Sequence, residues 1–408
     1  MTYLEFFDDV AIENVCACLS RPPSKVIMLG DDSKKMNIHK AAYQSVLKKR
    51  GYDVEFVIKS INRNDLYCIC DALCEIICNE DELEIGLTGG DDLFLVAIGM
   101  LYEKYGRKFK IHRFNLENRT LCDFTDGKKC IYCELPILTV RENIAIYGGE
   151  VIETDGLTPT DRSFIDPNFK VVCKKAWDAC RYNTRTWNKQ IGLLGELYES
   201  RAEAEGLTAS CKRDIFAEVL EKEGKSISFS YPLINKLKNI GLITDFSDSD
   251  VVSVTFSSEL ARRLLTVAGL ALELHVFLNC ASITQGNTLK YDDILSGVSI
   301  DWDGRDAFVP NKPETVNEVD VILMEGAVPT FISCKNGYFD ANELYKLSSV
   351  AERFGSKYSK KLLVASEPSK DTNAYKTICE RAADMGITLI DGVSDMSDYD
   401  LTRKIISA

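Results

Sequence analysis

Hydrophobic and polar positions in the first 150 residues alternate between short apolar runs and longer amphipathic stretches. Four of the apolar runs have the length of buried strands: residues 25–30, 53–59, 83–88 and 108–114. The first of them, KVIMLG, ends in a glycine, which is typical of a parallel strand covered on both faces. Helical stretches separate these runs, so the pattern predicts right-handed crossovers and a doubly wound, Rossmann-like α/β domain over residues 1–155. A strand-rich tail at 135–152 is expected to complete it.

The next part of the chain, residues 156–267, has a helical pattern that ends in a pair of short strands. Three helices are expected at about 194–205, 211–223 and 231–240, and residues 241–256 follow as a two-stranded wing. This order predicts a helical, winged-helix-like segment. A DNA-reading winged helix needs several basic residues on its recognition helix, but only Lys236 and Lys238 are available here. A structural linker is therefore favoured, and a ligand-responsive transcription regulator is the alternative.

Residues 268–408 predict a third domain, which begins with a strongly apolar helix at 268–280. Further elements are expected in the order strand, strand, strand, helix, strand, helix, strand, at residues 294–308, 318–324, 330–334, 341–354, 361–365, 372–385 and 387–390. The whole chain is thus expected to be an α/β protein of three domains, which suits its length of 408 residues.

The two central strands of this third domain carry charged residues in an alternating pattern. Because successive side chains point to opposite faces of a strand, Glu318 and Asp320 share one face of the first strand. Ser333 and Lys335 likewise share one face of the second strand. If these faces coincide, carboxylates and an ammonium group meet at one edge of the sheet. Carboxylates hold Mg²⁺ or Mn²⁺, and this combination suits phosphodiester cleavage, although a plain ion pair has the same pattern.

The segment resembles the PD-(D/E)xK nuclease superfamily, whose core has this order of helix and strands. Asp320 matches the first acid and Lys335 the lysine, but Ser333 occupies the place of the second acid. A replacement carboxylate is therefore expected. Glu273 is the first candidate, because a lone glutamate in an apolar helix is costly to bury unless it is paired or binds a metal. Glu343 is the second candidate, and the expected metal ligands are Asp320, Glu273 and Glu318.

Composition narrows the class of protein. The net charge of −13 argues against a protein that coats nucleic acid through bulk electrostatics. No apolar run approaches the roughly 20 residues of a membrane helix, and the N-terminus lacks a signal pattern, so a cytoplasmic protein is expected. The fifteen cysteines are accordingly expected to be reduced and mostly buried. Cys130 and Cys133 form a CxxC pair without a second pair, which is not enough to predict zinc.

Two strand-to-helix junctions of the first domain lie at the carboxyl ends of parallel strands, where open α/β sheets bind ligands. Their residues are Gly30, Asp31, Asp32 and Ser33 in one loop and Thr88, Gly89, Gly90 and Asp91 in the other. Glycines allow close approach of a ligand to the backbone, and the aspartates suit helix caps or hydrogen bonds to sugar and base groups. The absence of a GxGxxG pattern argues against a dinucleotide coenzyme.

Together, a Rossmann-like domain with a TGGD turn and a nuclease core with the strand FISCKNG resemble the CARF-domain nucleases of type III CRISPR systems, in particular the Can and Card group. The resemblance implies a homodimer that binds cyclic tetra-adenylate at the two loops described above. It also implies that this activator switches on cleavage of single-stranded DNA or RNA, with duplex nicking in some members, in the presence of Mn²⁺ or Mg²⁺. Catalysis is then expected from Asp320, Ser333 and Lys335. A CARF domain that also degrades its activator is a further alternative.

Overall fold

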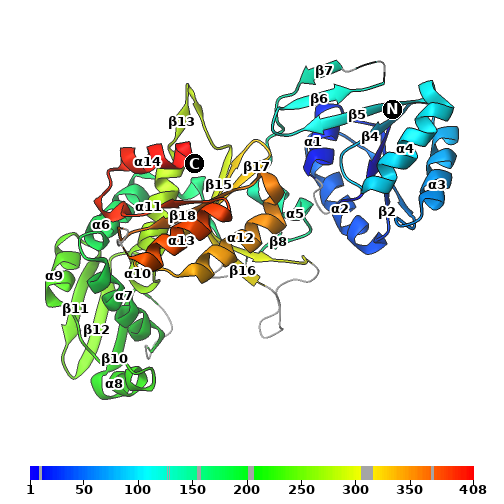
Figure 1. The fold of residues 1–408 in the computed structure, drawn as a ribbon. Coiled ribbons are helices and arrows are strands. Elements are labelled where there is room, and N and C mark those ends of the chain that lie inside the picture. Colours follow the sequence, from blue (N-terminus) through cyan, green and yellow to red (C-terminus); the bar gives the residue numbers. More distant parts are fainter. Residues whose placement is uncertain are drawn as a thin grey trace.

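The computed structural model describes residues 1–8, 12–125, 127, 129–153, 158–200, 206–304, 316–368 and 372–408. The described residues form two seven-stranded sheets, a three-stranded sheet and a two-stranded hairpin. In Figure 1 the N-terminal sheet lies at the right, the large C-terminal sheet in the middle and the three-stranded sheet at the lower left.

The N-terminal sheet has the strand order β3-β2-β1-β4-β5-β6-β7. Its five parallel strands are β1 (Thr2–Phe6), β2 (Lys25–Gly30), β3 (Glu55–Ser60), β4 (Leu83–Gly86) and β5 (Phe109–Asn115). Helices α1 (Ile12–Ser20) and α2 (Ser33–Lys49) pack on one face, and α3 (Leu66–Asn79) and α4 (Asp92–Tyr105) on the other. The predicted Rossmann-like domain is confirmed, with β1 as an additional central strand that the pattern did not predict.

Two antiparallel strands, β6 (Thr120–Asp123) and β7 (Lys129–Tyr132), extend this sheet and contain a disulfide between Cys122 and Cys130. The prediction that all cysteines are reduced is therefore wrong at this pair. Cys122 and Cys130 face each other directly in the ladder, with 4.0 Å between their Cα atoms. Cys133, the other cysteine of the CxxC pair, is free and buried.

The segment that follows belongs to the other large sheet. It forms α5 (Val140–Ile146) and two short strands, β8 (Glu150–Val151) and β9 (Thr160–Asp161), which pair with β15 (Asp293–Asp301). The tail at 135–152 was expected to complete the first domain, and the structure instead attaches it to the C-terminal sheet. An apolar pattern predicts a strand but does not specify the sheet that the strand joins.

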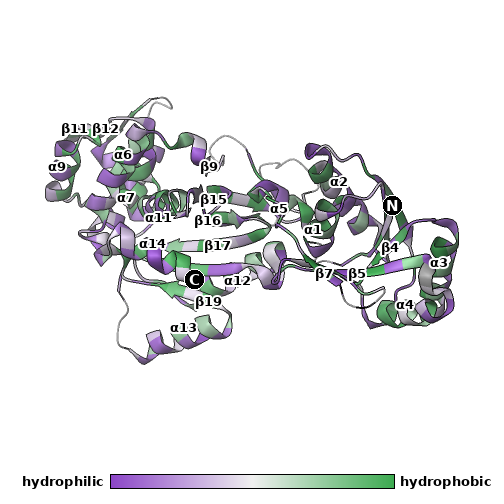
Figure 2. Ribbon diagram, turned by 90° about the horizontal axis from the view of Figure 1, so that it is seen from above, coloured by the Kyte–Doolittle hydropathy of each residue, from purple (hydrophilic) through white to green (hydrophobic). Residues whose placement is uncertain are grey.

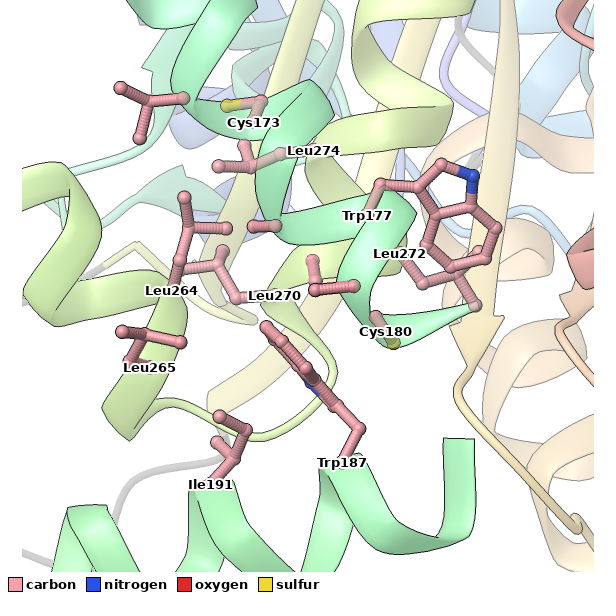
Figure 3. Packing of buried hydrophobic residues seen from close by; sticks show 14 of the residues in the cluster. Cys173, Trp177, Cys180, Trp187, Ile191, Leu264, Leu265, Leu270, Leu272 and Leu274 are labelled. Atoms are coloured by element: carbon pink, nitrogen blue, oxygen red, sulfur yellow. The ribbon is translucent and has the colours of Figure 1, made fainter. Parts of the chain in front are cut away.

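The middle of the chain contains the expected winged-helix order. Its elements are α6 (Pro167–Cys180), α7 (Thr184–Glu199), β10 (Thr208–Lys212), α8 (Arg213–Lys222), α9 (Tyr231–Asn239), β11 (Ile243–Asp248), β12 (Val251–Phe256) and α10 (Glu259–Thr266). Helices α6, α7 and α10 share a core with α11 (Leu270–Ala281), and Figure 3 shows Trp187 of α7 pointing toward Leu270 of α11. The middle segment is thus packed firmly against the C-terminal part of the chain.

The C-terminal sheet has the order β19-β18-β17-β16-β15-β8. Its remaining elements are β16 (Val316–Glu325), β17 (Val328–Lys335), α12 (Ala341–Gly355), β18 (Lys360–Ala365), α13 (Asn373–Asp384), β19 (Ile387–Ile390) and α14 (Asp398–Ser407). Helices α11 and α14 share one core with this sheet, and α5, α12 and α13 share the other. Hydrophobic residues concentrate along the central strands between these layers (Figure 2). A small hairpin, β13 (Thr284–Gln285) and β14 (Thr288–Leu289), projects beside them.

No single helix in the described ranges is long and apolar enough to cross a membrane. Helices α10 and α11 pass that test only as a pair, and they are bent by 119° relative to each other.

Candidate functional site

A cavity of about 920 Å³ opens where strands β15, β16 and β17 meet helices α10 and α11. Seven charged residues line it: Glu259, Arg262, Arg263, Glu273, Glu318, Asp320 and Lys335. Four of them were expected from the sequence to form the catalytic and metal-binding site. The cavity therefore brings together, from three separate elements, the carboxylates and the lysine that phosphodiester chemistry requires.

Asp320 is fixed by hydrogen bonds from the neighbouring strand β17. Its Oδ2 atom accepts one from the backbone N–H of Cys334 at 2.5 Å and one from the hydroxyl of Ser333 at 3.3 Å. Ser333 therefore orients Asp320 and does not itself supply the missing acid. Burial raises the pKa of Asp320, and the charge of Glu318 adds to the rise, although the Cys334 N–H and Lys335 oppose it.

The strand that carries Asp320 is locally irregular at this point. Val319 and Ile322, three positions apart, both face the core beneath α12, which strict alternation would not allow. Gly297, on the neighbouring strand β15, has a φ of +67° between Leu295 and Val298, which also share that core. This irregularity lets Glu318 and Asp320 both line the cavity beside α11.

Glu273 lies in the first turn of α11 and is only 9% exposed. Burial raises the pKa of its carboxyl well above the usual range, and the nearby charges of Asp320 and Glu318 raise it further. Gly269 caps the helix with a φ of +84°, and a Cβ atom there would lie 3.1 Å from Glu273 Oε1. The first candidate for the displaced acid thus lies in the same cavity as Asp320, and close enough for their charges to interact.

Lys335 ends strand β17, and its Nζ atom lies 2.6 Å from Glu343 Oε2 on α12. Burial disfavours the charged lysine, but the hydrogen bond to Glu343 and the charge of Asp320 outweigh it, so the pKa of Lys335 is raised. Glu343 also pairs with Lys346 at 2.9 Å, and the two lysines hold its pKa below the usual value despite its partial burial. The second candidate acid therefore positions the lysine and is not among the cavity-lining residues.

The donor set fits a hard divalent cation. Asp320, Glu273 and Glu318 offer carboxylate oxygens, the ligands that Mg²⁺ and Mn²⁺ prefer. Burial and, to a smaller extent, the neighbouring carboxylate charges raise the pKa values of Glu273 and Asp320, and a bound cation would balance that negative charge. In the described part of the chain, no three such side chains already lie within metal-binding distance of one another. Binding would therefore require the carboxylates to move closer together.

Two basic residues of the cavity were not predicted from the sequence, namely Arg262 and Arg263 of α10. Arg262 donates a hydrogen bond from Nε to Glu259 at 2.8 Å and packs over the ring of Tyr198. Arg263 is half-buried and makes no ion pair with any described residue. An unpaired guanidinium beside carboxylates is well suited to a phosphate group. Only the adjacent pair of arginines could have suggested this role, and such pairs are common on solvated helices.

The second predicted ligand loop, at the end of β4, borders another cavity. Thr88 and Gly89 line this space of about 670 Å³ together with Arg113, Lys357 and Lys361. The Oγ1 atom of Thr88 is buried and has no hydrogen-bond partner among the described residues.

Backbone geometry makes glycine necessary in that loop. Gly89 and Gly90 both have a φ of +77°, and a Cβ atom on Gly89 would lie 2.7 Å from the carbonyl oxygen of Phe6. The loop is thus shaped by its glycines, and the neighbouring Thr88 has a buried hydroxyl without a partner among the described residues.

The first predicted loop lies beside the second but does not line the same cavity. Gly30 ends β2, and Asp32 caps α2 by accepting hydrogen bonds from the N–H groups of Lys34 and Lys35. Ser33 is the first residue of α2. Arg63, which the sequence did not single out, lies 3.8 Å from Asp31 and 3.1 Å from Asp91. It connects the two loops electrostatically.

Comparisons with known proteins agree with this architecture. No known protein family matches the sequence, and no curated protein matches it. Among solved structures, Can2 from Sulfobacillus thermosulfidooxidans in complex with cyclic tetra-adenylate matches with a TM-score of 0.66 and 16% identity, covering 100% of this chain and 98% of Can2. This chain has the fold of Can2. Protein VC1899 from Vibrio cholerae also matches, with a TM-score of 0.70 and 18% identity over 100% of this chain and 97% of that one. The expected fold, and with it the resemblance to the Can and Card group at the level of fold, is confirmed.

Proposed function

We propose that this protein is a metal-dependent nuclease that cyclic tetra-adenylate activates in type III CRISPR defence. The observation that carries the proposal is the meeting of Asp320, Glu273 and Lys335 in one cavity. The shared fold with Can2, whose structure contains cyclic tetra-adenylate, supports the activator. We propose the same division as the sequence predicted: a CARF domain at 1–155, a winged-helix-like linker at 156–267 and a nuclease domain at 268–408. Single-stranded DNA or RNA is the proposed substrate, and the cytoplasm the proposed location.

In this proposal each group has one task. Asp320 and Glu273, with Glu318 beside them, hold the divalent cation. When bound, Mg²⁺ or Mn²⁺ polarises the phosphate and lowers the pKa of a water molecule. Lys335 has a raised pKa and is therefore an ammonium group at neutral pH, so it stabilises negative charge on the phosphate and does not act as the base. Glu343 holds that ammonium in place, and Arg263 is available to a neighbouring phosphate.

The N-terminal domain supports the proposal of a homodimer. Leu95, Val96 and Met100 of α4 are each about half exposed and form an apolar strip next to the TGGD turn. Large apolar residues gathered on one helix face are typical of an interaction surface. A two-fold dimer would present each ligand loop twice, which suits a cyclic ligand with matching symmetry.

The test is a cleavage assay with labelled single-stranded DNA and RNA, with and without cyclic tetra-adenylate and Mn²⁺. We expect cleavage only when both are present. Lys335→Ala should reduce it by at least about 100-fold, the typical loss when one charge-stabilising group is removed, while leaving activator binding intact. Lys404→Ala, which removes an exposed lysine of α14, is the matched control and should cleave normally. Absence of cleavage by the wild type would exclude the nuclease, and cleavage without activator would exclude the gating.

A further inference from the structure

A second cavity, of about 470 Å³, adjoins the catalytic one and has a different character. Thr184, Arg185, Tyr338, Phe339 and Tyr375 contribute to its walls. Asn188 and Tyr338 line both cavities, so the two spaces meet at these residues. Its volume lies within the range of about 300–1,000 Å³ that is typical of small-molecule sites.

The boundary between the cavities is a short loop that follows the catalytic Lys335. Asn336 donates a hydrogen bond from Nδ2 to Oδ1 of Asn188 at 2.7 Å, and Asn188 donates from Nδ2 to the carbonyl oxygen of Asn336 at 2.5 Å. Gly337 has a φ of +127°, a conformation that a side chain would strain. The loop is therefore fixed to α7, and it carries Tyr338 to the junction of the two cavities.

The aromatic residues of this cavity divide into a fixed pair and a free ring. Phe339 is buried and packs edge-on against Tyr375, with 6.4 Å between the ring centroids. Tyr375 is held further by its hydroxyl, which donates to Asp391 at 2.6 Å. Tyr338, by contrast, is 76% exposed. An exposed aromatic face beside a phosphate-handling site is the usual feature of a surface on which a nucleobase stacks.

Polar groups near the aromatic rings complete the cavity. Arg185 makes no ion pair within the described ranges, and it lies on the same helix as Asn188. Thr184 is buried and donates a hydrogen bond to Glu367, whose side chain also lines the cavity. A base that entered with its flat face on Tyr338 would find donors and an acceptor at its edge.

We propose that this second cavity is a nucleobase subsite, which binds the base of a nucleotide adjacent to the scissile phosphodiester by stacking on Tyr338. The proposal rests on the proposed nuclease function. We infer a nucleobase as the ligand because this cavity opens into the cavity that would bind the scissile phosphate. It assigns the substrate as an unpaired strand, since a base stacked in a duplex cannot enter such a cavity.

The test measures binding separately from cleavage. The probes are a fluorescein-labelled single-stranded DNA and a series of the same strand in which one abasic nucleotide is moved along the sequence. Anisotropy is recorded with full-length protein, cyclic tetra-adenylate and EDTA, so that no strand is cut. Tyr338→Ala and Tyr338→Phe are compared with wild type, and Tyr399→Ala removes a similarly exposed tyrosine of α14 as the control.

We expect one abasic position, and Tyr338→Ala on the intact strand, each to weaken binding by about 5- to 150-fold, the range for loss of one base–aromatic stack. Combined, the two changes should weaken binding no further than either alone, because they remove the same contact. Tyr338→Phe should bind normally, as should Tyr399→Ala.

Each contrary result has a distinct meaning. Equal binding at every abasic position, or losses that multiply when combined, would overturn the subsite even if the wild type cleaves with Mn²⁺. A single sensitive position without any cleavage would leave the subsite standing and remove the nuclease. Failure of the wild type to bind the intact strand would remove both.

Discussion

At the scale of single residues, Glu273 has the largest effect on the stability of the proposed catalytic cavity. Its carboxyl is buried next to Asp320 and Glu318, so its folded-state pKa lies above the value in the unfolded chain. Below the pKa of the unfolded chain, the Glu273 carboxyl is protonated in both states and does not lower the free energy of unfolding. As the pH rises, the unfolded chain ionises first, and the folded state loses relative stability until the folded pKa is passed.

Glu273→Gln should therefore stabilise the metal-free protein by about 1–3 kcal/mol at neutral pH, and by nothing in acid. Denaturant unfolding at a series of pH values checks this. Mn²⁺ should raise the stability of the wild type more than that of the variant, because the glutamine no longer supplies a charged ligand. A stability difference independent of pH would show that the effect comes from packing and not from the buried charge.

Glu343 acts on the same site through Lys335. Removing its charge with Glu343→Gln should release the ammonium from its 2.6 Å contact. Outer residues of this kind typically contribute 10- to 100-fold, so we expect activated cleavage to fall by that amount, mainly in kcat. Glu380→Gln of α13 changes an exposed glutamate in the same domain and is the control. Cleavage by Glu343→Gln at the wild-type rate would argue against a positioning role.

Sequence predicts some of these residues and not others, for a physical reason. Asp320 and Lys335 were recognisable because they occupy fixed places on adjacent strands, and Glu273 because burial of an isolated carboxylate is costly. Arg63, Asn188 and Arg263 reach their sites only after distant segments pack together. Nothing in their local sequence distinguishes them from solvated polar residues.

At the scale of elements, strand and helix positions were largely predictable, whereas the partners of the strands were not. The apolar runs gave β2 to β5 and β16 to β19 nearly at their observed bounds. The allocation of β8 and β9 to the C-terminal sheet, and the Cys122–Cys130 pairing, depend on contacts between segments. Periodicity reports which face of an element is buried, but it does not report which element covers that face.

The winged-helix segment yields an element-scale prediction about the alternative function. Lys236 donates to the carbonyl oxygen of Asp178 at 3.3 Å, and Lys238 lies 3.6 Å from Asp245, so both lysines of α9 have partners within the protein. We expect the double variant Lys236→Ala/Lys238→Ala to retain activated cleavage and to bind duplex DNA as weakly as the wild type. A gel-shift titration measures this. Tight, sequence-specific duplex binding that the variant loses would favour the transcription regulator instead.

At the scale of the whole molecule, the cavity at the end of β4 is lined by residues of both the N-terminal and the C-terminal parts of the chain. Thr88 and Gly89 of the β4–α4 loop line it together with Lys357 and Lys361 of the C-terminal part. Nearby, the hydroxyl of Tyr358 donates a 2.6 Å hydrogen bond to Glu13 of α1. A ligand that enters this space touches both parts at once. An activator shifts the balance between two arrangements of these parts only if it binds one arrangement more tightly than the other. A ligand that contacts both parts can do so.

The dimer gives the last prediction at this scale. Helix α4 lies on the far side of the N-terminal domain from the C-terminal sheet (Figure 1), and the side chains of its apolar strip are exposed, so a second copy can reach them. Leu95→Asp combined with Met100→Asp would place two carboxylates in the proposed interface, where burial of unpaired charge is strongly unfavourable. We expect this double variant to be monomeric by light scattering after gel filtration. It should also lose activator binding in calorimetry, because each copy alone offers only half of the ligand loops.

Ile406→Asp, which adds a carboxylate to an exposed apolar position on α14, should remain dimeric and bind the activator normally. Circular dichroism checks whether the double variant is folded. We expect that it is, because both replaced side chains of α4 are half exposed and contribute little to the core. A double variant that stays dimeric would place the interface elsewhere. A folded monomer that binds cyclic tetra-adenylate as tightly as the wild type would show that one copy completes the ligand site, and the symmetry argument for the activator would then fail.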